Sequence, residues 1–252
     1  MRAYPRLFAA LLALCVLASC APAHAGEHFA SASRDFGPSG RFLGRIQLTP
    51  VFVSTPGHPW TEEKRQEWWD AWHLSADFIG REAARYGAEI SLSAAFYETE
   101  IPMEYDSELG WYWYLMRNYF LAESMTELQR RVETEYQADD APHLFLFNSA
   151  GRSHAYASAR GVEWNEEFSV LFCGEPIVSG SITHELLHLY GAIDLYDYEL
   201  EEVQPAAAKQ FPSSVMLSIN GEIDELTAWL IGWTDTKSRR VTDFLEETAG
   251  LR

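Results

Sequence analysis

One eleven-residue segment constrains the fold of this chain more than any other: His-Glu-Leu-Leu-His-Leu-Tyr-Gly-Ala-Ile-Asp. His184 and His188 lie four positions apart, so on a helix both imidazoles project from one face and can bind a single zinc ion. Glu185 is placed where a carboxylate can accept a proton from a zinc-bound water. Gly191 allows a sharp turn, because glycine adopts positive φ without steric cost, and this turn can bring Asp194 back toward the metal.

The residues around this motif are typical of an amphipathic helix. Ile182, Leu186, Leu187 and Leu189 give it an apolar side, while the histidines and Glu185 lie on the other. The alternative is that both histidines are ordinary solvated or hydrogen-bonded helix residues. A helix buried in the core would not need the polar stripe, which favours the metal-binding interpretation.

The first residues have the pattern of an export signal. Arg2 and Arg6 precede an apolar run from Leu7 to Ala18. That run is too short for a permanent membrane span and has the length of a secretory signal. We therefore expect residues 1–19 to be a signal peptide of the lipoprotein type.

Two cleavage sites compete within this region. Leu17-Ala18-Ser19-Cys20 resembles the lipobox of bacterial lipoproteins, which would make Cys20 the lipidated residue. The product would be an exported lipoprotein, periplasmic or on the cell surface, that meets the membrane only through its lipid anchor. The alternative is cleavage after Ala23-His24-Ala25, which would give a soluble secreted protein.

The charge of the chain excludes some partners. Removing residues 1–19, which hold two arginines and no acidic residue, changes the formal net charge from −18 to −20. Such an acidic protein is expected to repel nucleic acid and anionic membrane surfaces. Cys173 is then the only thiol besides Cys20, so we expect no intramolecular disulfide.

Hydrophobic periodicity predicts an α+β domain that contains the motif. Small and polar residues at 20–40 indicate a tether, and residues 41–252 form the domain. We expect an N-terminal subdomain at 41–192 that includes the zinc helix, and a small, mainly helical or irregular C-terminal subdomain at 193–252. A mixed five-stranded sheet with packed helices is expected.

The predicted strands lie at residues 43–53, 88–97, 143–147, 152–160 and 167–172. The predicted helices lie at residues 61–86, 111–137, 222–233 and 238–249, in addition to the helix of the motif.

The extended motif His-Glu-x-x-His-x-x-Gly-x-x-Asp resembles the zinc signature of the metzincin clan of metallopeptidases. Most members have histidine at the last position, and an aspartate there is similar to the snapalysin branch of small secreted bacterial proteases. Metzincins also have a methionine in a tight turn below the metal. Met216, 28 residues after His188, is the candidate for this Met-turn.

The resemblance implies a metzincin-like fold, one catalytic Zn²⁺ and hydrolysis of peptide bonds in a polypeptide substrate. It assigns His184, His188 and Asp194 as ligands, Glu185 as the general base and Met216 as a structural floor. The chain would then be a zinc-dependent metalloendopeptidase that uses a Glu-activated, zinc-bound water.

Two alternatives remain open at the level of sequence. In the gluzincin class the third ligand is an acidic residue on a later helix, for which Asp224 and Glu225 are candidates. A non-catalytic surface lipoprotein with a structural zinc is the other alternative, and Cys173 could then supply a fourth ligand. The presence of Glu185 favours an enzyme, because a structural site does not need a base.

Overall fold

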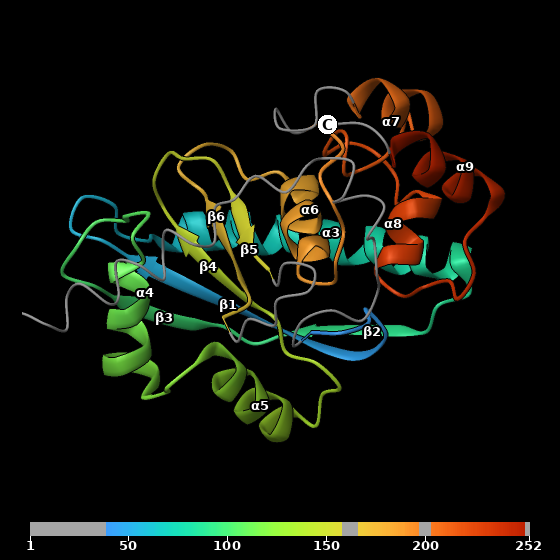
Figure 1. Cartoon of the computed structure of the whole chain (residues 1–252). Helices are drawn as coiled ribbons and strands as arrows, with labels where there is room; N and C mark the ends of the chain where they lie inside the picture. Colours follow the sequence, from blue (N-terminus) through green and yellow to red (C-terminus); the bar gives the residue numbers. More distant parts are fainter. Residues whose placement is uncertain (1–38, 158–165, 197–202, 250–252) are drawn as a thin grey trace, which may run out of the picture.

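The structure, a computed structural model, describes residues 39–157, 166–196 and 203–249. A mixed β-sheet lies at its centre, and helices cover both faces of the sheet (Figure 1). The strand order is β2-β1-β4-β6-β5, β3 also pairs with β1, and only the β5–β6 pairing is antiparallel. The strands are β1 (Gly44–Ser54), β2 (Ile90–Ala94), β3 (Tyr97–Glu100), β4 (His143–Phe147), β5 (His154–Tyr156) and β6 (Phe168–Phe172).

The described helices have the following bounds: α3 (Glu62–Tyr86), α4 (Gly110–Leu115), the π-helix η1 (Met116–Phe120), α5 (Met125–Tyr136), α6 (Ser179–His188), α7 (Gln204–Gln210), α8 (Glu225–Leu230) and α9 (Arg239–Thr248). The predicted α+β class with a mixed sheet is confirmed. The C-terminal helices α8 and α9 lie within the predicted helical segments, whereas α7 has no counterpart among the predicted elements.

The sheet has six strand segments instead of the predicted five, because the strand expected at residues 88–97 is interrupted. β2 pairs with the first half of β1, and β3 pairs with its second half. The interruption lies opposite Pro50. The amides of Gln47 and Thr49 donate toward the β4 side of β1. Residue 50 therefore faces the opposite neighbour, to which proline has no N–H to donate.

The long helix predicted after Thr61 is confirmed as α3. The Thr61 hydroxyl accepts a hydrogen bond from the Lys64 amide at 3.3 Å, which caps the first turn. Gly87 ends the helix with a φ of 69°. Trp68 and Trp72 are buried on the face that packs against the sheet.

The single helix predicted from Trp111 to Gln137 is wrong, because the structure divides it into α4, η1 and α5. Leu121 adopts a φ of 51°, and a left-handed residue cannot continue a right-handed helix. Ser124 then starts α5 as its N-cap by accepting from the Glu127 amide at 3.2 Å. No glycine or proline marks the break in the sequence, where Phe120, Leu121 and Ala122 follow one another.

Each face of the sheet has its own hydrophobic core. Leu144 and Leu146 of β4 belong to the core that includes α3 and α6, whereas Phe145 and Phe147 belong to the core below α4 and α5. Because both faces of β4 are covered, the strand is apolar at every position after His143. α6 is thereby fixed against one face of a sheet that is buried on both sides.

The start of the described chain is hydrogen-bonded to its C-terminal part. The amide of Phe42 donates to the carbonyl of Ile231 at 2.9 Å, and Trp233 Nε1 donates to the carbonyl of Phe42 at 2.7 Å. The Phe42 ring stacks on Tyr190, with 4.2 Å between ring centroids. These contacts join the segment before β1, the end of the α6 region and the segment after α8.

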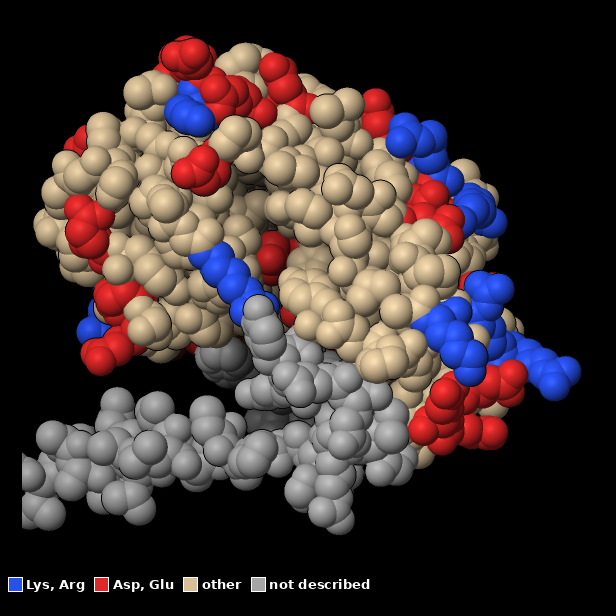
Figure 2. All heavy atoms as spheres, turned by 90° about the horizontal axis from the view of Figure 1, so that it is seen from above, with Lys and Arg blue, Asp and Glu red and all other residues tan. Residues whose placement is uncertain are grey.

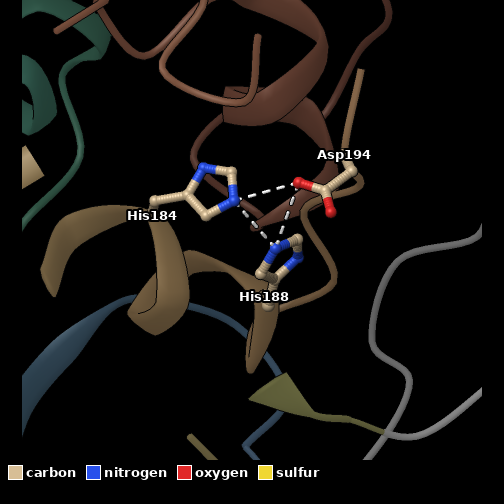
Figure 3. Close-up of side chains that lie close together, drawn as sticks. All are labelled: His184, His188 and Asp194. Atoms are coloured by element: carbon tan, nitrogen blue, oxygen red, sulfur yellow. Dashed lines mark hydrogen bonds and ion pairs between the residues drawn. The ribbon is translucent and has the colours of Figure 1, made fainter. Parts of the chain in front are cut away.

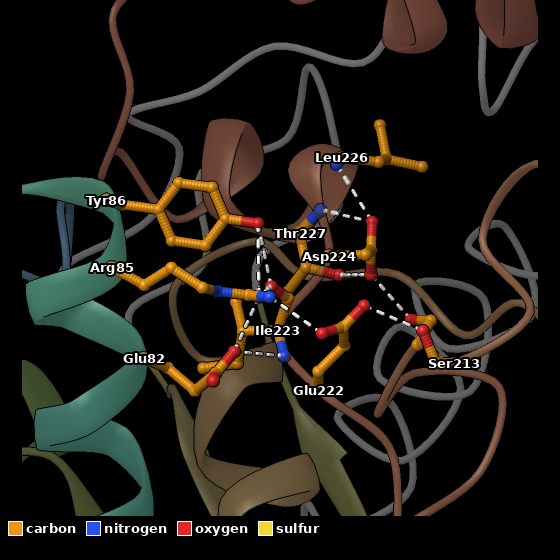
Figure 4. Close-up of polar contacts among 10 residues, drawn as sticks. Glu82, Arg85, Tyr86, Ser213, Glu222, Ile223, Asp224, Leu226 and Thr227 are labelled. Atoms are coloured by element: carbon orange, nitrogen blue, oxygen red, sulfur yellow. Dashed lines mark hydrogen bonds and ion pairs between the residues drawn. The ribbon is translucent and has the colours of Figure 1, made fainter.

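The last turn of α3 forms a second connection to the C-terminal part (Figure 4). Arg85 forms an ion pair with Glu222 at 2.6 Å and also donates to the carbonyl of Ile223. The Tyr86 hydroxyl donates to the same carbonyl at 2.8 Å, and Glu82 accepts from the Ile223 amide at 2.9 Å. Both backbone groups of Ile223 are therefore held by α3.

Several predictions concern residues outside the described ranges. The signal peptide at 1–19, lipidation at Cys20, and all but the last two residues of the tether at 20–40 lie outside them, as does the end of the strand predicted at 152–160. Within the described ranges, no helix combines the length and the apolar composition needed to cross a bilayer.

Candidate metal centre

The structure brings together the three ligands predicted from the sequence. His184 and His188 project from one face of α6, and Gly191, with a φ of 92°, reverses the chain so that Asp194 faces them (Figure 3). The two Nε2 atoms are 3.2 Å apart. Asp194 Oδ1 lies 2.9 Å from Nε2 of His184 and 3.4 Å from Nε2 of His188.

Backbone carbonyls orient both imidazoles. Nδ1 of His184 donates to the carbonyl of Val215 at 3.1 Å, and Nδ1 of His188 donates to the carbonyl of Ala192 at 3.0 Å. A carbonyl can only accept, so the proton of each neutral ring is on Nδ1 and the lone pair is on Nε2. Both lone pairs then point to the space that Asp194 Oδ1 also faces.

This geometry fits a zinc ion. Ligands held tetrahedrally at about 2.0–2.1 Å from one zinc lie about 3.3 Å from each other, close to the three distances between these atoms. Asp194 Oδ1 is buried and, despite its short contacts, accepts no hydrogen bond of satisfactory geometry. Among the described residues, His184, His188 and Asp194 form the one group of three or more potential ligands with converging atoms.

The charges of the group also favour a cation. Burial opposes ionisation of Asp194, but the adjacent imidazoles outweigh burial, so the pKa of Asp194 lies well below its ordinary value. Burial likewise opposes protonation of His188, yet Asp194 and Glu185 raise the pKa of His188 to about 9. The negative charge of the group is therefore balanced by a proton or by a cation that replaces it.

Glu185 lies beside the three ligands, and its electrostatic partners include both histidines and Asp194. Its side chain is buried, and Oε2 has no hydrogen-bond partner. Burial raises the pKa of Glu185 above its ordinary value. A buried carboxylate oxygen without a donor is costly to maintain, which indicates that water or a ligand binds there.

Met216 lies in the segment below the ligands. It is fully buried, its amide donates to Ser214 Oγ at 3.0 Å, and its carbonyl accepts from the Leu195 amide at 2.9 Å. The preceding carbonyl, that of Val215, orients His184. The segment around Met216 therefore supports one ligand directly and fixes the chain next to Asp194.

The later acidic residues have other partners. Asp224 caps α8 by accepting from the amides of Leu226 and Thr227 at 2.8 and 3.1 Å. Glu225 accepts from Ser238 and lies 3.8 Å from Arg240. The alternative in which Asp224 or Glu225 replaces Asp194 is therefore not supported by their positions.

Cys173, the candidate fourth ligand, is also separate from the group. It is buried at the end of β6, and burial raises the pKa of its thiol to about 12. Its sulfur contacts the carbonyl of Leu171 at 3.8 Å. Among the described residues, it does not belong to the group of converging ligand atoms.

Sequence reasoning selects the ligands but misses two neighbouring groups. The carbonyl of Val215 has no sequence signal, because any residue offers a carbonyl. The hydroxyl of Tyr196 lies 3.4 Å from Nε2 of His184. The sequence places Tyr190, Tyr196 and Tyr198 next to the motif as possible donors to an oxyanion, but tyrosines beside a helix end usually serve packing, which is why Tyr196 is not among the predicted site residues.

The described surface is hollowed between its two halves, and acidic atoms are visible on the floor of the hollow (Figure 2). The hollow separates the part that contains most of the sheet from the C-terminal helices.

Comparisons with known proteins add a distant likeness. No family model matches the chain, and no curated protein matches it. Among solved structures, the chain is similar to metalloproteinase-II from Bacteroides fragilis, with 12% sequence identity and a TM-score of 0.42. The match covers 78% of this chain and 55% of that one. The geometry of the three ligand residues and Glu185 therefore carries the functional conclusion.

Proposed function

We propose that this protein is a zinc-dependent endopeptidase whose metal is held by His184, His188 and Asp194. One observation carries the proposal: three ligand atoms converge beside the buried and unpartnered carboxylate oxygen of Glu185. Two imidazoles and one carboxylate are a typical zinc ligand set, whereas Mg²⁺ and Ca²⁺ prefer oxygen ligands. Three protein ligands leave a position for water or substrate, as in catalytic zinc sites.

When bound, Zn²⁺ would polarise the scissile carbonyl and make a water molecule more acidic. Glu185 then accepts the proton of the attacking water at Oε2, which has no hydrogen-bond partner in the structure. The water oxygen bonds to the carbonyl carbon, and the bond to the amide nitrogen breaks. Glu185 delivers the same proton to the leaving nitrogen, so the carboxylate is regenerated in each turnover.

The hollow between the two halves of the molecule is where a polypeptide substrate would bind. The net charge of −18 makes nucleic acid an unfavourable partner. We extend the proposal to an exported protein, anchored through lipid at Cys20 or released in soluble form.

A closed structural zinc site would be the alternative function. Such sites usually hold the metal with four protein ligands. In the described part of the chain the group has three, and Cys173 is buried elsewhere with its own contact. The unpartnered Oε2 of Glu185 therefore favours the enzyme.

The test is to measure zinc content and cleavage of an unfolded protein for wild type and Glu185→Ala. The variant should retain one zinc per chain and lose about 1,000-fold or more in activity, because a general base contributes about 100- to 10,000-fold. Glu246→Ala, which changes an exposed residue of α9, is the control and should match wild type. Full activity in Glu185→Ala, or activity that resists a chelator, would contradict the proposal.

A further inference from the structure

The position of Tyr196 is not explained by packing alone. The chain bends at Leu195 and Tyr196, and the Leu195 amide is fixed to the carbonyl of Met216 at 2.9 Å. This bend places the Tyr196 ring beside the His184 ring, with 5.8 Å between their centroids and 30° between their planes. The hydroxyl lies 3.4 Å from Nε2, the same atom that would bind the metal.

The hydrogen bonds of the Tyr196 hydroxyl determine where its proton can go. Arg152, on the loop before β5, hydrogen-bonds to this hydroxyl. A guanidinium can only donate, so the tyrosine oxygen accepts from it and keeps its own O–H for another acceptor. In the structure the acceptor within reach is the lone pair of His184 Nε2. Metal binding uses that lone pair and leaves the O–H without this acceptor.

We infer that Tyr196 is a further catalytic residue, whose hydroxyl donates a hydrogen bond to the scissile carbonyl oxygen as water adds to the carbonyl carbon. This inference rests on the proposed function. The O–H lies beside a metal-binding atom, and the oxygen that gains negative charge would be next to the metal. No proton is transferred in this step. The hydrogen bond strengthens as the carbonyl oxygen becomes an anion.

Arg152 is a positioning residue in this arrangement. By donating to the tyrosine oxygen, it polarises the O–H bond and makes the hydroxyl a stronger donor, as in other hydrogen-bonded chains. It also connects the loop before β5 with the loop that contains Asp194.

The main test compares Tyr196→Phe with wild type. This change removes one oxygen and keeps the ring, so kcat should fall about 100-fold while KM changes less than about 3-fold. The Zn²⁺ dissociation constant, measured by competition with a chelating dye, should stay within about 2-fold of wild type, because Tyr196 is a donor and not a ligand. Binding of a phosphinic peptide, which mimics the charged adduct, should weaken about as much as kcat/KM falls.

Tyr119→Phe is the matched control. Its hydroxyl donates to the carbonyl of Glu98 at 2.8 Å, away from the three ligand residues, and its removal should leave kcat unchanged. A less than 3-fold loss of kcat in Tyr196→Phe would overturn the inference. So would a more than 10-fold weaker affinity for Zn²⁺, which would make Tyr196 a ligand. A wild type that cleaves no peptide would overturn the proposed function and this inference together.

The role of Arg152 is tested by a double-mutant cycle. Arg152→Ala should lower kcat about 10-fold in wild type and should have almost no effect in the Tyr196→Phe background, because it acts through the tyrosine hydroxyl. Arg152→Lys, which can still donate, should recover part of the loss. Additive effects of the two changes would show that Arg152 acts independently of Tyr196.

Discussion

Two buried or partly buried aspartates, Asp194 at the metal centre and Asp224 before α8, differ in what surrounds their oxygens. Asp224 Oδ1 accepts from two backbone amides at 2.8 and 3.1 Å, and Oδ2 accepts from Ser214 Oγ and Thr227 Oγ1, each at 2.6 Å. Asp194 Oδ1 accepts no satisfactory hydrogen bond and faces two imidazole nitrogens instead. Both residues are candidate third ligands in the sequence, where the spacing after Gly191 favours Asp194.

The hydrogen bonds around a carboxylate therefore distinguish a structural residue from one that can bind a ligand. The oxygens of Asp224 are saturated with donors, so binding a cation would require breaking bonds that hold α8 and the segment before Met216. Asp194 has an oxygen without a donor and neighbours that offer lone pairs, which is the environment that a cation completes. Removing the two side chains should therefore have opposite consequences.

The largest effect is expected for Asp194→Ala. Loss of one of three zinc ligands should weaken Zn²⁺ binding about 1,000-fold, because zinc binding energy is shared among few ligands. Peptidase activity should fall below detection at ordinary zinc concentration. In the presence of a chelator the free energy of unfolding should fall by about 1–2 kcal/mol, because the variant loses the ion pairs of Oδ1 with the two imidazoles. Zinc retention equal to wild type would assign the third ligand elsewhere.

Asp224→Ala should show the reverse pattern. The change removes a helix cap and leaves two amides and two hydroxyls without their acceptor, which should cost about 3 kcal/mol in the free energy of unfolding. The folded fraction should bind Zn²⁺ with wild-type affinity. Urea denaturation and zinc titration measure the two quantities, and Asp243→Ala, at an exposed position of α9, is the control. Weaker zinc binding with unchanged stability would reverse the roles of the two aspartates.

His143 is a useful contrast to Asp194. Its two ring nitrogens also have no hydrogen-bond partner, but they lie in the core and not at the metal centre. Burial lowers the pKa of His143 to about 3, against about 6.5 in the unfolded chain. The folded state therefore excludes the proton, and stability is lost as pH falls below about 6.5. Between pH 7 and pH 5 the loss should be about 2 kcal/mol.

The measurement is urea denaturation of the zinc-free protein at both pH values, for wild type and His143→Phe. The variant should lose about 2 kcal/mol less than wild type between the two pH values, since the other titrating groups are common to both proteins. The same pH dependence in both proteins would show that His143 accepts a proton in the folded state.

Much of the fold follows from local sequence signals. Thr61 and Gly87 mark both ends of α3, and Ser238 starts α9 through a hydrogen bond to the Val241 amide at 3.2 Å. The break at Leu121 could not be predicted, since its left-handed backbone depends on tertiary packing and not on a glycine. The interruption opposite Pro50 depends on which neighbour faces the missing N–H, and only strand pairing decides that.

The candidate site shows a similar division. His184, Glu185 and His188 lie on one helix, so their spacing alone predicts how they are placed relative to each other. The position of Asp194 depends on how far Gly191 turns the chain, and competing acidic residues could be judged only from their hydrogen bonds. Tyr196 acquires its proposed role from contacts with residues distant in the chain, which no local pattern contains.

The contacts of Phe42 have a consequence for the order in which this protein can fold during synthesis. Phe42 precedes the entire sheet in the sequence, yet its backbone partners are Ile231 and Trp233, 189 and 191 positions later. A ribosome makes almost the whole domain before these partners emerge. The ring of Phe42 also stacks on Tyr190, close to the ligand His188. A nascent or C-terminally truncated chain therefore lacks part of the packing behind the metal-binding helix, which links metal-site assembly to completion of the polypeptide.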